Sequence, residues 1–234
     1  MKKFLLLLLF LAAFASKAQE QNTLTNDEKK AGWQLLFDGK TTAGWHGYNM
    51  KGIYSAWRVA DGELYLDATA PDRGDIITDQ EFENYELMLE WKITDCGNSG
   101  IIFNSIESPK YKHAYETGPE MQILDNACAP DAKIPKHRAG NLYDLIAPAT
   151  ESAKPANQWN AVRIISNKGH LELWLNGALQ AETTMFTPEW EAMIAKAKWK
   201  NYPDFGKSNK GRVMLQGDHE GRVSFRNIKI RLLR

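Results

Sequence analysis

The chain has 234 residues, and its 29 Lys and Arg are balanced by 29 Asp and Glu. A net charge of zero gives no electrostatic reason to bind nucleic acid or an anionic membrane surface, so we expect neither partner. Eight Trp and eight Tyr are many for this length, and they suit either core packing or the stacking of sugar rings.

The first 18 residues have the pattern of a signal peptide. Lys2 and Lys3 form a positive n-region, residues 4–14 are apolar, and Ser16–Ala18 matches a small-x-small cleavage site. The apolar run is too short to span a bilayer, and no later run is longer, so we expect no membrane span. The pattern predicts an exported protein, periplasmic or extracellular, that begins near Gln19 or Glu20.

The rest of the chain, roughly 215 residues, suits one domain. We expect a flexible polar leader over 19–31 and a single domain over 32–234. Cys96 and Cys128 are the only cysteines. Export permits a disulfide between them, but two separate buried thiols fit the sequence as well. Two cysteines are too few for a zinc site of the CxxC type.

Short strands and turns follow one another along the domain. Asp61-Gly62 between residues 56–59 and 63–66 is the strongest hairpin signal, and Asn176-Gly177 marks a second tight hairpin. Residues 85–93 alternate strictly between apolar and polar, which predicts a long strand with one buried face. Ten to twelve such strands predict an all-β, two-sheet antiparallel sandwich of jelly-roll type.

The stretch 115–126 is central to this pattern. After the turn signal Gly118-Pro119, an extended chain would point Glu120, Gln122 and Leu124 one way and Met121, Ile123 and Asp125 the other. The apolar side should pack against a hydrophobic core. The side that carries Glu120 and Gln122 either faces water or holds a polar ligand.

A long irregular region and one helix complete the chain. Residues 127–158 are rich in Ala, Pro, Asn and Lys, and a loop of this length is usually functional or mobile. Thr187 as N-cap and Pro188 at the first helical position predict a short helix near 188–200, which Tyr202-Pro203 ends.

A set of short motifs follows in a fixed order along the chain: Gly32-Trp33, Leu36–Lys40, Gly44-Trp45, Asn98–Ile101, Glu120-x-Gln122-x-Leu124-Asp125, Trp159-Asn160, Leu175–Gly177, Leu215-Gln216-x-x-His219 and Phe225–Ile228. In these motifs and their order the sequence resembles the bacterial 3-keto-disaccharide hydrolase domain family, a resemblance that covers nearly all of the mature chain. It implies a concanavalin-like sandwich and a secreted or periplasmic glycoside hydrolase that acts on a carbohydrate partner. Asn104 departs from the pattern, which has an Arg there, and this puts one substrate contact in question.

The implied chemistry begins from a sugar with a ketone at C3, whose C2 proton is acidic. A general base removes that proton, hydrogen-bond donors or a cation stabilise the enolate, and the C1 substituent leaves; water adds later. The resemblance assigns catalytic roles to Glu120, Asp125 and His219. It assigns substrate contacts to the following residues: Trp45, Asn98, Gln122, His137, Tyr143, Lys154 and Gln216.

Cofactor use stays open at this point. Glu and His side chains could hold a divalent metal over the ketone oxygen, but no HxH or HExxH motif identifies the ligands, and we expect no other cofactor. Which residue is base and which is acid, the identity of the sugar and its aglycone, and the oligomeric state do not follow from the sequence.

Several of these candidates also have a simpler interpretation. Glu120 and Gln122 fit the wet face of a strand, and Asp125 fits a turn cap. His219 fits an ordinary hairpin, His137 a surface position, and Trp45 the core, although a loop Trp after Gly44 could also be a stacking platform.

Two other functions fit the same fold. A laminarinase-like retaining β-glucanase would need two carboxyl groups about 5–5.5 Å apart. Glu120 and Asp125 would need a bulge to meet, because residues i and i+5 of a regular strand face opposite ways. The third function is a non-catalytic carbohydrate-binding sandwich. An enzyme should gather at least two titratable groups in a concave pocket, whereas a binding module can show an aromatic platform alone.

Overall fold

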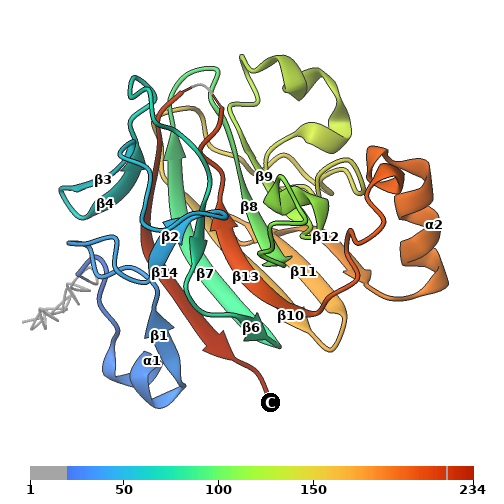
Figure 1. The fold of residues 1–234 in the computed structure, drawn as a ribbon, viewed down its shortest axis with the longest axis horizontal. Coiled ribbons are helices and arrows are strands. Elements are labelled where there is room, and N and C mark those ends of the chain that lie inside the picture. Colours follow the sequence, from blue (N-terminus) through green and yellow to red (C-terminus); the bar gives the residue numbers. More distant parts are fainter. Residues whose placement is uncertain (1–19, 220) are drawn as a thin grey trace, which may run out of the picture.

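The structure is a computed structural model that describes residues 20–219 and 221–234. Two antiparallel sheets pack face to face, so the predicted all-β sandwich is confirmed (Figure 1). The predicted signal peptide lies outside the described residues. No helix in the described part of the chain is long and apolar enough to cross a membrane.

The larger sheet has eight strands in the order β12-β11-β10-β7-β14-β4-β3, with β1 paired to β14. Their bounds are β1 Trp33–Leu35, β3 Trp57–Ala60, β4 Glu63–Leu66, β7 Tyr85–Ile93, β10 Asn160–Asn167, β11 His170–Leu175, β12 Ala178–Thr184 and β14 Val223–Leu232.

The smaller sheet has six strands in the order β2-β5-β13-β8-β9, with β6 paired to β13. Their bounds are β2 Trp45–Gly47, β5 Ile76–Thr78, β6 Phe82–Glu83, β8 Asn98–Ser105, β9 Glu120–Leu124 and β13 Lys210–Leu215.

The helices are short and lie outside the two sheets (Figure 1). Their bounds are α1 Asn26–Lys30, η1 Ala114–Glu116, η2 Pro130–Lys133, η3 Pro135–His137, α2 Pro188–Lys196 and η4 Lys198–Asn201. The helix predicted near 188–200 is therefore α2 followed by η4. Thr187 caps α2 as predicted, because its Oγ1 accepts a hydrogen bond from the Trp190 N–H at 3.2 Å. The extended backbone of Ala197 separates α2 from η4.

The hairpin turns form where the sequence predicts them. Asp61 and Gly62 both have positive φ, 52° and 74°, as a type I′ turn requires, and they join β3 to β4. Asn176 and Gly177 repeat this geometry between β11 and β12.

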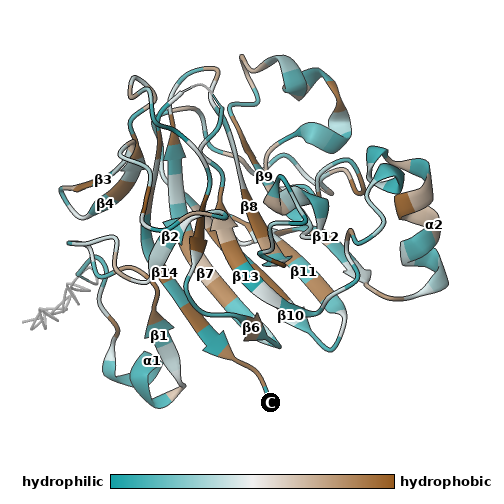
Figure 2. Cartoon of the chain, in the orientation of Figure 1, coloured by the Kyte–Doolittle hydropathy of each residue, from teal (hydrophilic) through white to brown (hydrophobic). Residues whose placement is uncertain are grey.

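The core lies between the sheets. The alternation over β7 is confirmed, since its inward side chains Tyr85, Leu87, Leu89, Trp91 and Ile93 are all almost fully buried. Figure 2 shows the hydrophobic positions gathered on the strands, whereas α1 is hydrophilic. Six of the eight Trp are buried, which makes core packing their main role.

The predicted flexible leader differs from the structure over residues 20–31. Thr25 and Glu28 form a capping box that begins α1. Asn22 is buried, and it exchanges two hydrogen bonds with Asn227, between backbone N–H groups and side-chain oxygens, at 2.7 and 2.8 Å. Polar composition suggested a loose segment, but these polar groups satisfy one another and the backbone of the domain.

Candidate functional site

The site is built on the outer face of the smaller sheet, where β8 and β9 run antiparallel. Gly100 lies opposite Gln122, and Ile102 lies opposite Glu120. Met121 and Ile123 point into the core as predicted. Glu120 and Gln122 point the other way, yet they are only 6% and 1% exposed, so the wet-face interpretation is wrong.

The 127–158 loop helps to bury this face. Residues 140–143 of the loop run along the free edge of β9, and Gly140 and Tyr143 donate their N–H groups to the carbonyls of Gln122 and Glu120 at 2.9 and 3.0 Å. The Gln122 N–H donates in turn to the carbonyl of Asn141 at 3.2 Å. The loop therefore covers an edge strand and places Tyr143 beside Glu120.

Five chain segments line a cavity of about 240 Å³ over this face. Its lining residues are Asn98, Tyr115, Glu120, Gln122, Asp131, Tyr143, Lys198, Trp199, Gln216, Asp218 and His219. The structure thus brings together Glu120, His219, Gln122, Tyr143, Asn98 and Gln216 of the predicted site.

Glu120 is the buried carboxyl group of the cavity. Burial raises its pKa to about 8, and the negative charges of Asp75, Asp218 and Asp131 act in the same direction, while Lys198 opposes the rise. A carboxyl group whose pKa lies above its ordinary range is a stronger base once it is ionised.

Gln122 orients the Glu120 carboxylate. One end of its amide lies 3.0 Å from Glu120 Oε1 and 3.0 Å from the Ser99 carbonyl oxygen. Because both neighbours are acceptors, that end is the nitrogen, and Gln122 donates to Glu120. The other end of the amide lies 3.2 Å from the Asn98 side chain.

Lys198 supplies the positive charge of the cavity. Its Nζ lies 4.2 Å from the ring centroid of Tyr143 and 4.5 Å from that of Trp199, so two aromatic faces support the ammonium group. Burial lowers the pKa of Lys198, although the carboxylates of Glu120, Asp144 and Asp131 counteract this.

Gln216 offers the cavity a polar group with no partner. The residue is 5% exposed, and its side-chain Oε1 accepts no hydrogen bond within the described protein. Its main chain is well held, since its N–H donates to Gly100 O at 3.0 Å and its carbonyl accepts from Ser99 Oγ at 2.9 Å. A buried acceptor without a partner is costly unless a ligand or water supplies the donor.

The mouth of the cavity carries more exposed titratable groups. Asp218 and His219 lie on the segment between β13 and β14, with side chains 42% exposed. Asp131 enters from η2, and its Oδ2 accepts a hydrogen bond from the Tyr143 hydroxyl at 3.1 Å. Burial raises the pKa of Tyr115 to about 12.

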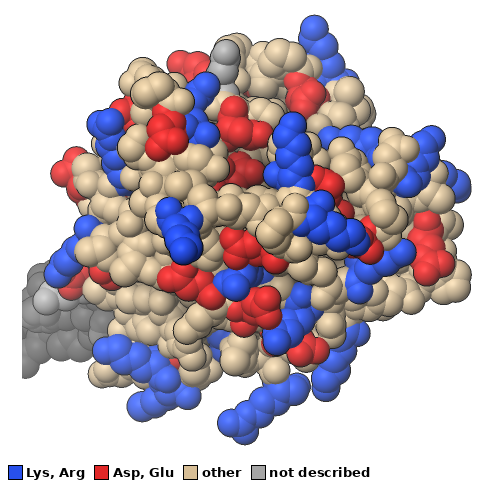
Figure 3. Space-filling model, viewed as in Figure 1, with Lys and Arg blue, Asp and Glu red and all other residues tan. Residues whose placement is uncertain are grey.

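Figure 3 shows Lys and Arg mixed with Asp and Glu over the face of the molecule drawn there.

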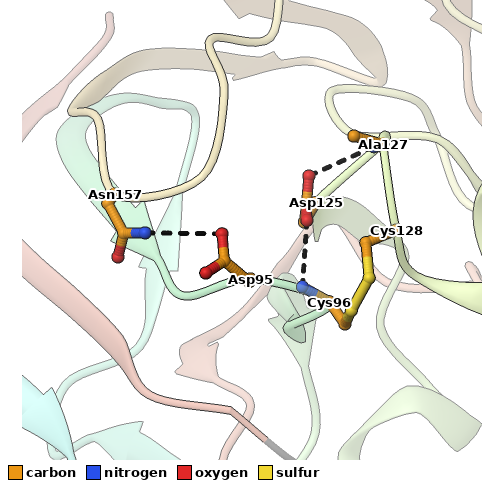
Figure 4. The surroundings of a disulfide bond; sticks show 6 residues. All are labelled: Asp95, Cys96, Asp125, Ala127, Cys128 and Asn157. Carbon is orange, nitrogen blue, oxygen red and sulfur yellow. Dashed lines mark hydrogen bonds between the residues drawn. A yellow bond between two sulfur atoms is a disulfide. The ribbon is translucent and has the colours of Figure 1, made fainter.

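Asp125 is a structural residue, so its predicted catalytic role is wrong. Its Oδ2 accepts from the Cys96 N–H at 2.9 Å and its Oδ1 from the Ala127 N–H at 3.1 Å (Figure 4). Asp125 ends β9 as a turn cap, the simpler of the two interpretations. Since it does not line the cavity, it cannot form the carboxylate pair with Glu120 that a retaining glucanase would need.

Cys96 and Cys128 form a disulfide beside this turn (Figure 4). The sequence left this pairing open. The bond ties the β7–β8 turn to the start of the long loop, which carries Asp131 and Tyr143. It therefore anchors one wall of the cavity.

Three predicted substrate contacts lie elsewhere. Trp45 is a core residue, 5% exposed, whose Nε1–H donates to Leu36 O at 2.6 Å. Lys154 is exposed, and its Nζ donates to Trp159 O at 3.0 Å, outside the cavity. His137 stacks on the Tyr143 ring with centroids 4.3 Å apart, so it supports the cavity from behind rather than lining it.

Asn104, the residue that departs from the family pattern, is fully buried and adopts a left-handed φ of 54°. It accepts from the Tyr85 hydroxyl at 2.9 Å and donates to Ser166 Oγ at 3.1 Å, and the pairing of β8 with β13 shifts register next to it. Asn tolerates this conformation well. Because the Asn104 side chain is buried and both of its polar atoms are already hydrogen-bonded, Asn104 makes no substrate contact here.

A resident metal does not fit the described residues. Over 20–219 and 221–234, no three His, Cys, Asp or Glu side chains come together as a ligand set. The divalent metal considered from the sequence stays a prediction, and we derive no step from it.

The cavity also contains residues that sequence reasoning missed: Tyr115, Asp131, Lys198, Trp199 and Asp218. Lys198 and Trp199 lie at the end of the helix predicted near 188–200. Only the fold brings η4 to the cavity over β9.

Residues 32–231 match the model of a family described as a 3-keto-alpha-glucoside-1,2-lyase-like domain. A curated Bacteroides thetaiotaomicron protein named 3-keto-disaccharide hydrolase is 32% identical over 244 residues, 93% of this chain and 84% of that protein.

Two solved structures from Parabacteroides distasonis, both provisionally described as glycosyl hydrolases, share the fold. One has a TM-score of 0.84 at 32% identity and covers 92% of this chain and 100% of its own. The other has a TM-score of 0.65 at 27% identity and covers 86% of this chain and 99% of its own.

Proposed function

The chain belongs to the family of 3-keto-alpha-glucoside-1,2-lyase-like domains, and from this premise we propose that it cleaves 3-keto-glycosides by removing the proton at C2. The observation that carries the proposal is that one cavity is lined both by Glu120, a buried carboxyl group of raised pKa, and by Lys198, an amine that can carry a positive charge. A base and a cation in one cavity are what enolate formation needs.

Glu120 is the general base in this scheme. In its ionised form it takes the proton from C2, and the electron pair of the C–H bond moves into a C2–C3 double bond while the ketone becomes an enolate. The hydrogen bond from Gln122 keeps the carboxylate in one orientation. Only a C3 ketone makes the C2 proton acidic enough for a carboxylate.

Lys198 stabilises the negative charge on the enolate oxygen. When the ketone re-forms, the electron pair moves to a C1–C2 double bond and the C1–O bond breaks. His219, at the mouth, donates a proton to the leaving oxygen, so the aglycone departs as a neutral alcohol. Water then adds its hydroxyl to C1 and a proton to C2, and the net reaction is hydrolysis.

The remaining cavity residues hold the sugar. The unpartnered Oε1 of Gln216 accepts a hydrogen bond from a hydroxyl group, and the Asn98 amide binds another. Tyr115, Tyr143 and Trp199 give the ring apolar surfaces. We also propose that the protein is exported through its N-terminal signal and works in the periplasm or outside the cell.

The test is to incubate the protein with a 3-keto-glycoside and with its unoxidised parent while aglycone release is followed. A matched control is Glu189→Gln, which changes an exposed carboxylate on α2. We expect release from the keto form alone, unchanged in this control. Comparable cleavage of the parent would contradict the scheme.

Two further arms separate the alternatives. Sugar binding without release from either substrate would favour a non-catalytic carbohydrate-binding module. Loss of activity with a chelator, restored by a divalent cation, would show that the reaction uses a metal, although the described residues form no ligand set of three.

A further inference from the structure

Behind the cavity, two neighbouring residues of the long loop accept hydrogen bonds from two neighbouring residues of η4. Asp144 Oδ2 accepts the Lys198 N–H at 2.9 Å, and the Tyr143 carbonyl accepts the Trp199 Nε1–H at 3.0 Å. The Lys198 ammonium lies over the Tyr143 ring. Tyr143, Lys198 and Trp199 line the cavity, whereas Asp144 does not.

Asp144 is itself held in an unusual conformation. Its φ is +60°, a left-handed value that is uncommon for residues other than glycine. Its Oδ1 lies 3.3 Å from His137 Nε2, and its N–H donates to Lys136 O at 3.0 Å. Backbone strain of this kind persists only where the surroundings enforce it, and it is common around functional sites.

We propose that Asp144 is the positioning residue that holds Lys198 against Tyr143 and toward Glu120. This rests on the proposed function only where activity is the readout. The carboxylate acts twice: one oxygen fixes the main chain where η4 begins, and the negative charge favours the protonated form of the Lys198 amine.

Three carboxyl groups on neighbouring elements raise the pKa of Lys198: Glu120 on β9, Asp131 on η2 and Asp144 on the loop favour the ammonium form, while burial opposes it. Asp218 and His219, at the mouth, are the other titratable groups that line the same cavity. Removing one of three stabilising charges should therefore lower the pKa of Lys198.

Asp144→Asn is the main variant. Asn tolerates a left-handed φ, and its amide oxygen can still accept the Lys198 N–H, so the fold should survive and only the charge is lost. Asp144→Ala removes the acceptor as well. The matched control is Asp204→Asn, which removes the carboxylate beside exposed Lys110.

The experiment measures the extent of trace acetylation of each lysine amine in the folded protein as a function of pH. After the reaction is quenched, the label on each lysine is quantified by mass spectrometry. We expect the labelling midpoint of Lys198 to fall by about half a unit or more in Asp144→Asn. The control should move the midpoint of Lys110 and leave that of Lys198 in place. A Lys198 midpoint that stays unchanged in Asp144→Asn would overturn the proposal.

Activity on the 3-keto-glycoside adds a second readout. In Asp144→Asn, the alkaline limb of the kcat/KM profile should move to lower pH together with the labelling midpoint. In Asp144→Ala, kcat should fall by about 10- to 100-fold, because the cation is displaced. If the wild-type protein cleaves no 3-keto-glycoside, the proposed function fails, yet the labelling result still decides the role of Asp144.

Discussion

The carboxylate of Glu120 occupies the space that any side chain at position 100 would need. A Cβ atom built on Gly100 would overlap Glu120 Oε1 and lie 2.7 Å from its Cδ. The backbone of Gly100 does not require glycine for its φ, so the close approach of Glu120 is what excludes a side chain here.

Gly100→Ala should therefore move the carboxylate and leave the sandwich intact, because the end of a Glu side chain can shift. We expect kcat to fall by about 100-fold with a small change in melting temperature. Kinetics of Gly100→Ala, Glu120→Gln and the double variant would check this. If both changes act on one carboxylate, the double variant should be hardly slower than Glu120→Gln, whereas multiplied losses would contradict the account.

Glu120→Gln keeps the size of the side chain and removes its charge. We expect turnover to fall by about two to four orders of magnitude. Glu189→Gln, on the exposed face of α2, should retain wild-type turnover. A Glu120→Gln protein with near wild-type activity would exclude Glu120 as the base.

The same variant should not be less stable at neutral pH. The pKa of Glu120 is raised from 4.5 to about 8 by burial, so the folded protein holds this proton more tightly than the unfolded chain does. Stability from this group is therefore lost as pH rises from 4.5 to about 8. Thermal unfolding should show that the stability of Glu120→Gln relative to the wild type increases as pH rises over this range. A difference in stability that decreases as pH rises would contradict the burial argument.

These expectations revise what the sequence alone predicted for Glu120. The alternation over β9 correctly placed Met121 and Ile123 in the core and Glu120 on the opposite face. It could not show that residues 140–143 cover that face, because the covering contacts are main-chain hydrogen bonds between distant segments. The hairpins were predictable because Asp61-Gly62 and Asn176-Gly177 have local turn preferences.

The wrong assignments share a cause. Trp45 follows a loop glycine, but its indole N–H finds the carbonyl of Leu36, and nothing local in the sequence marks that partner. Asp125 carries the right chemistry, yet two backbone N–H groups already use it. Lys198 was missed because its place in the site depends on the bonds between η4 and residues 143 and 144 of the long loop.

Gln216→Leu should separate substrate binding from stability. The variant removes a buried oxygen that has no partner, so the melting temperature should not fall, while KM should rise by about tenfold from the loss of one hydrogen bond. Gln180→Leu is a matched control, because Gln180 Oε1 is also buried without a partner but lies away from the cavity. Equal KM changes in both variants would remove Gln216 from the site.

The pH profile should distinguish this site from one that uses an ordinary carboxylate. Removal of the C2 proton requires ionised Glu120 and protonated Lys198. Where this step limits the rate, kcat/KM should rise through neutral pH toward a limb near 8 and fall again at more alkaline pH. Because the two groups interact, the apparent pKa values of the two limbs describe the pair and not either residue alone. Rates from pH 5 to 11 would test this, and an optimum at acidic pH would contradict it.

If Glu120 removes the proton at C2, the fate of that hydrogen reports on this step itself. A 3-keto-glycoside carrying deuterium at C2 is incubated in ordinary water, with an enzyme-free incubation as control, and the released sugar is analysed by mass spectrometry. Each cleaved molecule should have lost its C2 deuterium, and in Glu120→Gln the loss of deuterium should slow together with cleavage. Aglycone release with the C2 deuterium retained would contradict this role of Glu120.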